Sequence, residues 1–235
     1  MNAVRLHAFG PAENLSYERT PRPVPAPGQV RIAVAAAGVH LLDTALRQGV
    51  QGPPAPLPEL PTIPGREVAG TVDALGPGTD PAWLGRPVVV HLGFAPGGYA
   101  EYAVADAQRL HPIPPGLDPA EAVAMIGTGR TALGLLAPGA RHLVFGWSDG
   151  PLALTDAERA GLTARGITTQ SVLGPVMLRR AGGDDPLRLL ETRALAEAAA
   201  GRLRPALQRY PLSEAAAAHR ALETRGTIGK VVLEP

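Results

Sequence analysis

The sequence predicts a mixed fold of the α+β or α/β class, in which a strand-rich N-terminal half precedes a helical C-terminal half. In residues 1–117, short runs of β-forming residues are separated by Gly and Pro. In residues 118–235, helix-capping signals alternate with two or three strand-like runs. The 235-residue chain is 45% hydrophobic, which predicts a folded core in spite of 28 glycines and 26 prolines.

The N-terminal half contains four segments that predict strands because they are rich in Val, Ile and Ala and lie beside turn residues. These segments are 29–37, 67–75, 86–92 and 99–104. Short strands at such regular spacing predict a small barrel or sandwich. Six prolines within residues 53–64 predict a stiff, extended loop between the first two strands.

In the C-terminal half, capping residues followed by Pro or an acidic residue mark the helix starts, and glycines mark the ends. The predicted helices begin at Asp118, Thr155, Asp185 and Ser213, and the last three end near Gly166, Gly201 and Gly226. The predicted strands are 142–146, 167–172 and 229–233.

Composition excludes several classes of function. A net charge of +1 gives no reason to expect nucleic acid or an anionic membrane as a partner. The absence of cysteine rules out disulfides, thiolate metal sites and a cysteine nucleophile, and the six histidines form no metal-binding motif, so we expect no metal. Without a long apolar run or a signal pattern near Met1, we expect a soluble, cytoplasmic protein.

Five motifs follow one another along the chain. They are Ala36-Ala37-Gly38-Val39-His40 with Asp43 and Arg47, Ile63-Pro64-Gly65-Arg66-Glu67, Gly97-Gly98-Tyr99, Gly127 to Ala132, and Gly229-Lys230-Val231. Together they resemble the medium-chain dehydrogenase/reductase superfamily, in its zinc-free quinone oxidoreductase-like (enoyl reductase-like) branch. The resemblance implies a GroES-like β-barrel catalytic domain over residues 1–126, to which a closing strand at 229–235 returns. It implies a truncated remnant of a Rossmann domain, with helices, over residues 127–228.

The sequence departs from this family where the nucleotide would bind. Leu136 leads almost directly into Pro138-Gly139, so most of the Rossmann unit, including its glycine-rich pyrophosphate turn, is missing. Residues 127–132 do fit G-x-G-x-x-A, but such a turn needs a strand before it, and 118–126 predicts a helix. We therefore expect no cofactor, with NADPH as the alternative.

The resemblance places the candidate residues around a pocket between the two domains. His40 is a candidate acid or base and Arg130 a group that polarises a carbonyl; the alternative for His40 is a structural, hydrogen-bonded histidine. Asp43 is either catalytic or paired with Arg47 on one helix face. The full set is His40, Arg130, Asp43 and Tyr99 as catalytic residues, and Arg66, Thr128, Thr131, Trp147 and Asp149 as substrate-binding residues.

Two further polar residues are interpreted as structural. Glu67 is expected to be buried, and His91 is expected to be a core histidine because it lies within an apolar strand.

Three functions remain open. The first is a reductase-derived enzyme of secondary metabolism that cyclises, isomerises, hydrates or dehydrates an enone, quinone or polyketide-like substrate without a redox cofactor. The alternative is an NADPH-dependent quinone or enoyl oxidoreductase, and the third is a non-catalytic ligand-binding protein. The resemblance further implies a homodimer through residues 167–176, because members of the family pair a late strand across a two-fold axis. The β-branched strand at 167–172 matches that strand, and its edge would otherwise be left open.

Overall fold

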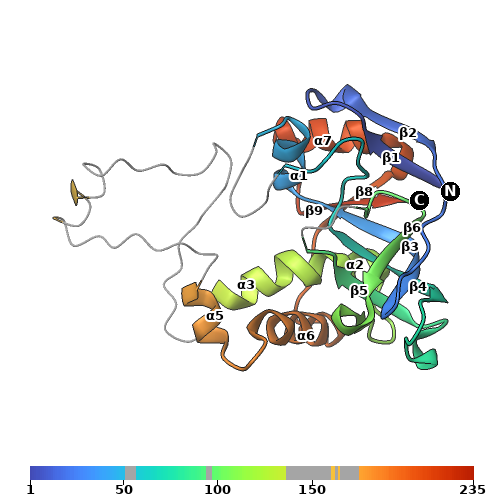
Figure 1. Ribbon diagram of the computed structural model, residues 1–235. Coiled ribbons are helices and arrows are strands. Elements are labelled where there is room, and N and C mark those ends of the chain that lie inside the picture. Colours follow the sequence, from blue (N-terminus) through green and yellow to red (C-terminus); the bar gives the residue numbers. More distant parts are fainter. Residues whose placement is uncertain (51–56, 94–96, 136–159, 162–163, 165–174) are drawn as a thin grey trace.

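The computed structural model describes residues 1–50, 57–93, 97–135, 160, 161, 164 and 175–235 (Figure 1). Its centre is a seven-stranded sheet in the order β7-β5-β4-β3-β9-β8, with β6 paired to β3 off this path. A separate two-stranded sheet pairs β1 (Asn2–Leu6) with β2 (Leu15–Arg19). The strands of the large sheet are β3 (Gln29–Val39), β4 (Glu67–Leu75), β5 (Pro87–His91), β6 (Tyr102–Asp106), β7 (His111–Pro112), β8 (Leu207–Pro211) and β9 (Lys230–Glu234).

The strands predicted for the N-terminal half are confirmed, with one shift. In β3, alternate residues such as Val30, Ile32 and Val34 enter the core, as expected for a strand with one buried face. The fourth strand begins at Tyr102 rather than Tyr99. The reason is that the Tyr99 backbone N–H donates to the carbonyl of Pro64, outside the ladder with β3.

The C-terminal end of the chain returns to the N-terminal sheet. Residues 37–39 of β3 pair antiparallel with residues 231–233 of β9, while β8 pairs parallel with β9. Helix α7 (Ala215–Glu223) connects these two parallel strands, which makes a β-α-β unit and a partial Rossmann-like sheet. This arrangement carries Lys230, the first residue of β9, to the end of β3.

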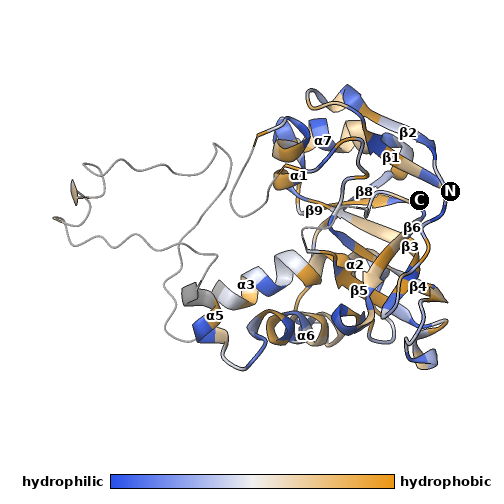
Figure 2. Cartoon of the chain, viewed as in Figure 1, coloured by the Kyte–Doolittle hydropathy of each residue, from blue (hydrophilic) through white to orange (hydrophobic). Residues whose placement is uncertain are grey.

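Helices cover both faces of the sheet (Figure 1). The helices α2 (Pro119–Ala124), α3 (Arg130–Leu135), α5 (Pro175–Ala181) and α6 (Pro186–Ala199) lie on one side, and α1 (Leu41–Arg47) and α7 on the other. Figure 2 shows that α2 and the strands beside it are largely hydrophobic. Accordingly, Ala36, Val89 and Val232 of the sheet pack with Ile126 and Ala194 in one buried cluster.

A π-helical turn (Met125–Gly129) joins α2 to α3, so Gly127 lies within a helical segment. This confirms the predicted helix before Gly127. Asp118 begins α2 as a capping box with Glu121, as the sequence predicts.

Several predicted features lie outside the described residues. They are the strands at 142–146 and 167–172, most of the helix from Thr155, Trp147 and Asp149, and all of the expected dimer interface except Pro175 and Val176 at the start of α5. The homodimer and the domain boundaries remain predictions. No helix of the described residues is long and apolar enough to cross a membrane.

Candidate active site

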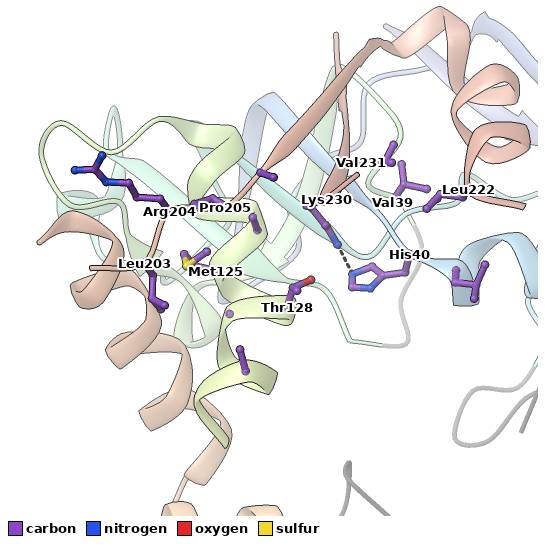
Figure 3. A pocket seen from close by; sticks show the side chains of 16 residues that line it. Val39, His40, Met125, Thr128, Leu203, Arg204, Pro205, Leu222, Lys230 and Val231 are labelled. Carbon is purple, nitrogen blue, oxygen red and sulfur yellow. Dashed lines mark hydrogen bonds between the residues drawn. The ribbon is translucent and has the colours of Figure 1, made fainter. Parts of the chain in front are cut away.

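A pocket of about 460 Å³ opens where β3 ends, beside the α2–α3 turn and the start of β9. Its walls are largely apolar and include Val39, Met125, Leu203 and Leu222, and its polar groups come from His40, Thr128, Arg204 and Lys230. Figure 3 shows His40 and Lys230 pointing toward one another, Thr128 facing the same space, and Arg204 extending away from them. Of the nine predicted site residues, those in the described part that line this pocket are His40 and Thr128.

Lys230, His40 and Glu67 form one cluster at the base of the pocket. The Lys230 ammonium donates to Glu67 Oε2 at 2.8 Å and lies 2.9 Å from His40 Nε2. His40 Nε2 is in turn 2.7 Å from Glu67 Oε2. Since one ring nitrogen contacts both a cation and a carboxylate, a proton on His40 Nε2 satisfies Glu67, and its removal lets that nitrogen accept from Lys230. The cluster can therefore hold and exchange a proton at the pocket surface.

The Glu67 carboxylate is fully buried, as expected from the sequence. Burial alone raises the pKa of a carboxyl group, but the positive charges of His40 and Lys230 outweigh it and hold the pKa of Glu67 well below its usual range. Two glycines leave room for this carboxylate: a Cβ at Gly38 would come within 2.5 Å of Oε2, and one at Gly127 within 1.8 Å of Oε1.

Asp43 and Tyr99 lie beneath the pocket and do not line it. Asp43 is buried at the start of α1, where its Oδ2 accepts from the His40 backbone N–H at 2.8 Å and from the Tyr99 hydroxyl at 3.2 Å. Arg66 lies 3.7 Å from the other oxygen of Asp43. The expected pairing of Asp43 with Arg47 is wrong, because the buried Arg47 guanidinium pairs instead with Glu223, the last residue of α7.

Arg130 and Thr131 do not line the pocket and bond to other groups of the protein. Arg130 pairs with Glu191 of α6, whose carboxylate also accepts from His111 Nε2 at 2.9 Å. The Thr131 hydroxyl donates to the Gly127 carbonyl at 2.9 Å, within its own helix. The two contacts of Glu191 join α3, α6 and β7, so Arg130 and Thr131 each have a structural partner. Their predicted site roles are not tested by this geometry, and those of Trp147 and Asp149 lie outside the described residues.

His91 is the last residue of β5 and is only partly buried, so its interpretation as a core histidine stays a prediction. Burial lowers its pKa to about 4, so the ring is neutral at physiological pH. Its Nδ1 accepts from the backbone N–H of Gly93 at 2.9 Å.

Sequence reasoning missed Lys230 as a site residue. The available signal was composition: among 22 Lys and Arg residues, Lys230 is the only lysine, and it stands in the motif that predicts the closing strand. His219 lies 3.3 Å from Arg47 Nε and 3.3 Å from the Tyr99 hydroxyl, and Glu191 contacts Arg130 and His111. Neither residue carried a sequence signal that distinguishes it from ordinary helix residues.

The cluster of Lys230, His40 and Glu67 does not fit a metal ion. Among the described residues, no three His, Asp or Glu side chains gather as a metal-binding group. The carboxylate and imidazole that could act as ligands, Glu67 and His40, already contact the Lys230 ammonium, which occupies the place of a cation.

Two family models match the chain. Residues 26–115 match the alcohol dehydrogenase GroES-like domain, and residues 120–233 match the zinc-binding dehydrogenase family. The pocket residues come from both segments, His40 and Glu67 from the first and Thr128 and Lys230 from the second.

Curated relatives point to the same family. The chain is 36% identical over 119 residues to a quinone oxidoreductase of Lama guanicoe, which is 50% of this chain and 35% of that protein. It is 35% identical over 134 residues to the chloroplastic quinone-oxidoreductase QR1 of Triphysaria versicolor, covering 56% of this chain and 40% of that protein. The chain thus spans well under half the length of these relatives.

Solved structures support the fold. The quinone oxidoreductase of Coxiella burnetii aligns with a TM-score of 0.76 at 20% identity, covering 100% of this chain and 99% of that chain. The Escherichia coli quinone oxidoreductase complexed with NADPH aligns with a TM-score of 0.73 at 18% identity, covering 100% of both chains.

The comparisons favour the oxidoreductase alternative over cofactor-free chemistry, for which they give no support. The motifs, the GroES-like strands with their returning β9 and the two matching family models agree, and the chain belongs to the medium-chain dehydrogenase/reductase superfamily as a quinone oxidoreductase-like protein.

Proposed function

We propose that this chain reduces small quinones or enones, with NADPH as the hydride donor. The observation that carries the proposal is the cluster of Lys230, His40 and Glu67, which places an exchangeable proton at the base of a mostly apolar pocket. A flat, apolar substrate with a carbonyl edge suits such a pocket. The relationship to quinone oxidoreductases supports the same substrate class.

The pocket fits the nicotinamide end of the cofactor. Its apolar walls suit the face of a flat ring, and Thr128 and His40 offer hydrogen bonds at its edge. Among the described residues, no strand leads into a glycine-rich turn that would bind a pyrophosphate, since Gly127 and Gly129 lie in a helical segment. When bound, NADPH supplies the hydride.

The residues of the chain handle the proton. When a hydride adds to a quinone, or to the β-carbon of an enone, negative charge develops on the carbonyl oxygen. With that oxygen near Lys230 Nζ, the ammonium group stabilises the charge and can donate a proton to it. His40 Nε2, 2.9 Å away, can return a proton to Lys230. Glu67 remains ionised throughout, because its pKa is held low, and balances the charge of the other two.

The test measures oxidation of NADPH, and separately of NADH, with benzoquinone and with a small enone as acceptors. His40→Asn is expected to lower kcat, whereas His7→Asn, which removes an exposed histidine paired with Glu18, is expected to leave it unchanged. If the folded wild-type protein oxidises neither nucleotide with either acceptor, the proposal is wrong.

A further inference from the structure

A line of four hydrogen bonds reaches His40 from the side opposite the pocket. Arg47 Nε lies 3.3 Å from His219 Nδ1, and His219 Nε2 lies 3.3 Å from the Tyr99 hydroxyl. Tyr99 lies 3.2 Å from Asp43 Oδ2, which accepts from the His40 backbone N–H at 2.8 Å. The line therefore runs from Arg47 at the end of α1, through His219 of α7 and the core, to His40, the residue that precedes α1.

The direction of every bond in this line follows from chemistry. Arginine is only a donor, so His219 Nδ1 must accept from Arg47 and the neutral ring carries its proton on Nε2. His219 Nε2 then donates to the Tyr99 oxygen, which leaves the Tyr99 hydroxyl proton for Asp43. The protonation states agree: burial and the Arg47 charge lower the pKa of His219 to about 4, and burial and Asp43 raise the pKa of Tyr99 well above its usual value.

The end of this line anchors the backbone of a pocket residue. Asp43 Oδ2 takes both the Tyr99 hydroxyl and the His40 N–H, so the two donors share one oxygen. Both Asp43 and Tyr99 are buried, and neither lines the pocket. On its other side, the His40 ring reaches Lys230 and Glu67.

We propose that Tyr99 and Asp43 are positioning residues that hold His40 in contact with Lys230 and Glu67. They act through the His40 backbone and do not touch the substrate. The kinetic part of this proposal rests on the proposed reductase function, whereas the position of the His40 ring can be measured without turnover.

The experiment compares Tyr99→Phe with Tyr17→Phe, which removes the hydroxyl of a half-exposed tyrosine on β2. NMR of the histidine ring nitrogens reads the tautomer and environment of His40, with His40→Asn used to assign its signals. Tyr99→Phe is expected to shift the His40 signals and to lower kcat roughly tenfold to a hundredfold with little change in KM, as expected when a reacting group is misplaced. Tyr17→Phe is expected to change neither.

A kinetic cycle separates positioning from a general loss of structure. Combined with His40→Asn, Tyr99→Phe is expected to cause no further fall in kcat, because its effect passes through His40. A folded Tyr99→Phe protein with wild-type His40 signals, or an equal fall in the His40→Asn background, overturns the proposal.

A second pair of variants serves if Tyr99→Phe does not fold. His219→Gln offers an oxygen to Arg47 and an N–H to Tyr99 and is expected to keep the His40 signals, whereas His219→Met breaks the line and is expected to shift them. Equal signals in both variants overturn the proposal. If the wild-type protein reduces no quinone, the proposed reductase function is wrong, and the NMR result still tests whether Tyr99 and Asp43 position His40.

Discussion

Replacing Lys230 with Met removes the ammonium from the buried cluster and keeps the length of the side chain. Glu67 then loses its donor at 2.8 Å, and its side chain, at 0% exposure, cannot gain a hydration shell in exchange. His40 remains beside it at 2.7 Å and compensates only when its ring is protonated. We therefore expect a large loss of stability that depends on pH.

The size of the loss follows from the burial of both partners. Removing one partner of a buried ion pair costs about 3–5 kcal/mol, which in a chain of this length lowers Tm by roughly 6–20 °C. Without Lys230, burial raises the folded-state pKa of Glu67, so the loss is greatest when the carboxyl group is ionised. Urea unfolding should therefore show a larger deficit at about pH 8 than at about pH 5, because the raised pKa lets Glu67 take up a proton more readily as the pH falls.

Two further proteins test the reasoning. The double variant Glu67→Gln/Lys230→Met buries no unpaired charge and is expected to be more stable than Lys230→Met alone. Arg204→Met removes an exposed cation from the same pocket and is expected to change stability by no more than about 0.5 kcal/mol. A loss below about 1 kcal/mol for Lys230→Met, or a double variant less stable than the single one, would refute the account.

Three other outcomes are expected. Gly127→Ala places a Cβ 1.8 Å from Glu67 Oε1 and should cost about 1–3 kcal/mol in urea unfolding; an unchanged midpoint contradicts this. Arg130→Ala leaves the buried Glu191 without its cation, so it should lower Tm while KM per folded molecule stays constant; a raised KM at unchanged Tm would instead restore Arg130 to the site. The pKa of Glu67 is lower in the folded protein than in the unfolded chain, so its contribution to stability is present above the ordinary pKa of a glutamate and is lost as the pH falls through the folded-state pKa. In Glu67→Gln, the free energy of unfolding should therefore depend less on pH over that range.

Local sequence patterns were sufficient to predict those helices and strands that are determined by residues close together in the sequence. The β3 strand has alternating buried residues, and Asp118-Pro119-Ala120-Glu121 contains its own cap, so both were predicted from the sequence. Strand β8 was not, because Leu207–Pro211 contains polar residues and a terminal proline. It is a strand because β9 lies beside it and supplies its parallel partner.

The site depended on contacts that no local pattern contains. His40 was predicted from its motif, but its partner Lys230 is 190 residues away and Glu67 reaches Lys230 across 163 residues. Arg47 was expected to pair within its helix, and the helix spacing is correct for that. Glu223 and His219, brought in by α7, compete successfully for its guanidinium.

The glycines of the helical turn show why a motif needs its surroundings. Gly127-Thr128-Gly129-Arg130-Thr131-Ala132 matches a dinucleotide-binding pattern, in which glycines permit a tight turn and a close phosphate. Here the segment is helical, and each glycine is explained by what would meet its Cβ. Gly127 borders the Glu67 carboxylate, and a Cβ at Gly129 would lie 2.9 Å from Met125 Sδ and 3.3 Å from Ala194 Cβ of α6. Gly127 therefore makes room for a buried charge, and Gly129 lets two helices approach. The two-glycine pattern is thus compatible with a site centred on Glu67 and does not require a bound phosphate.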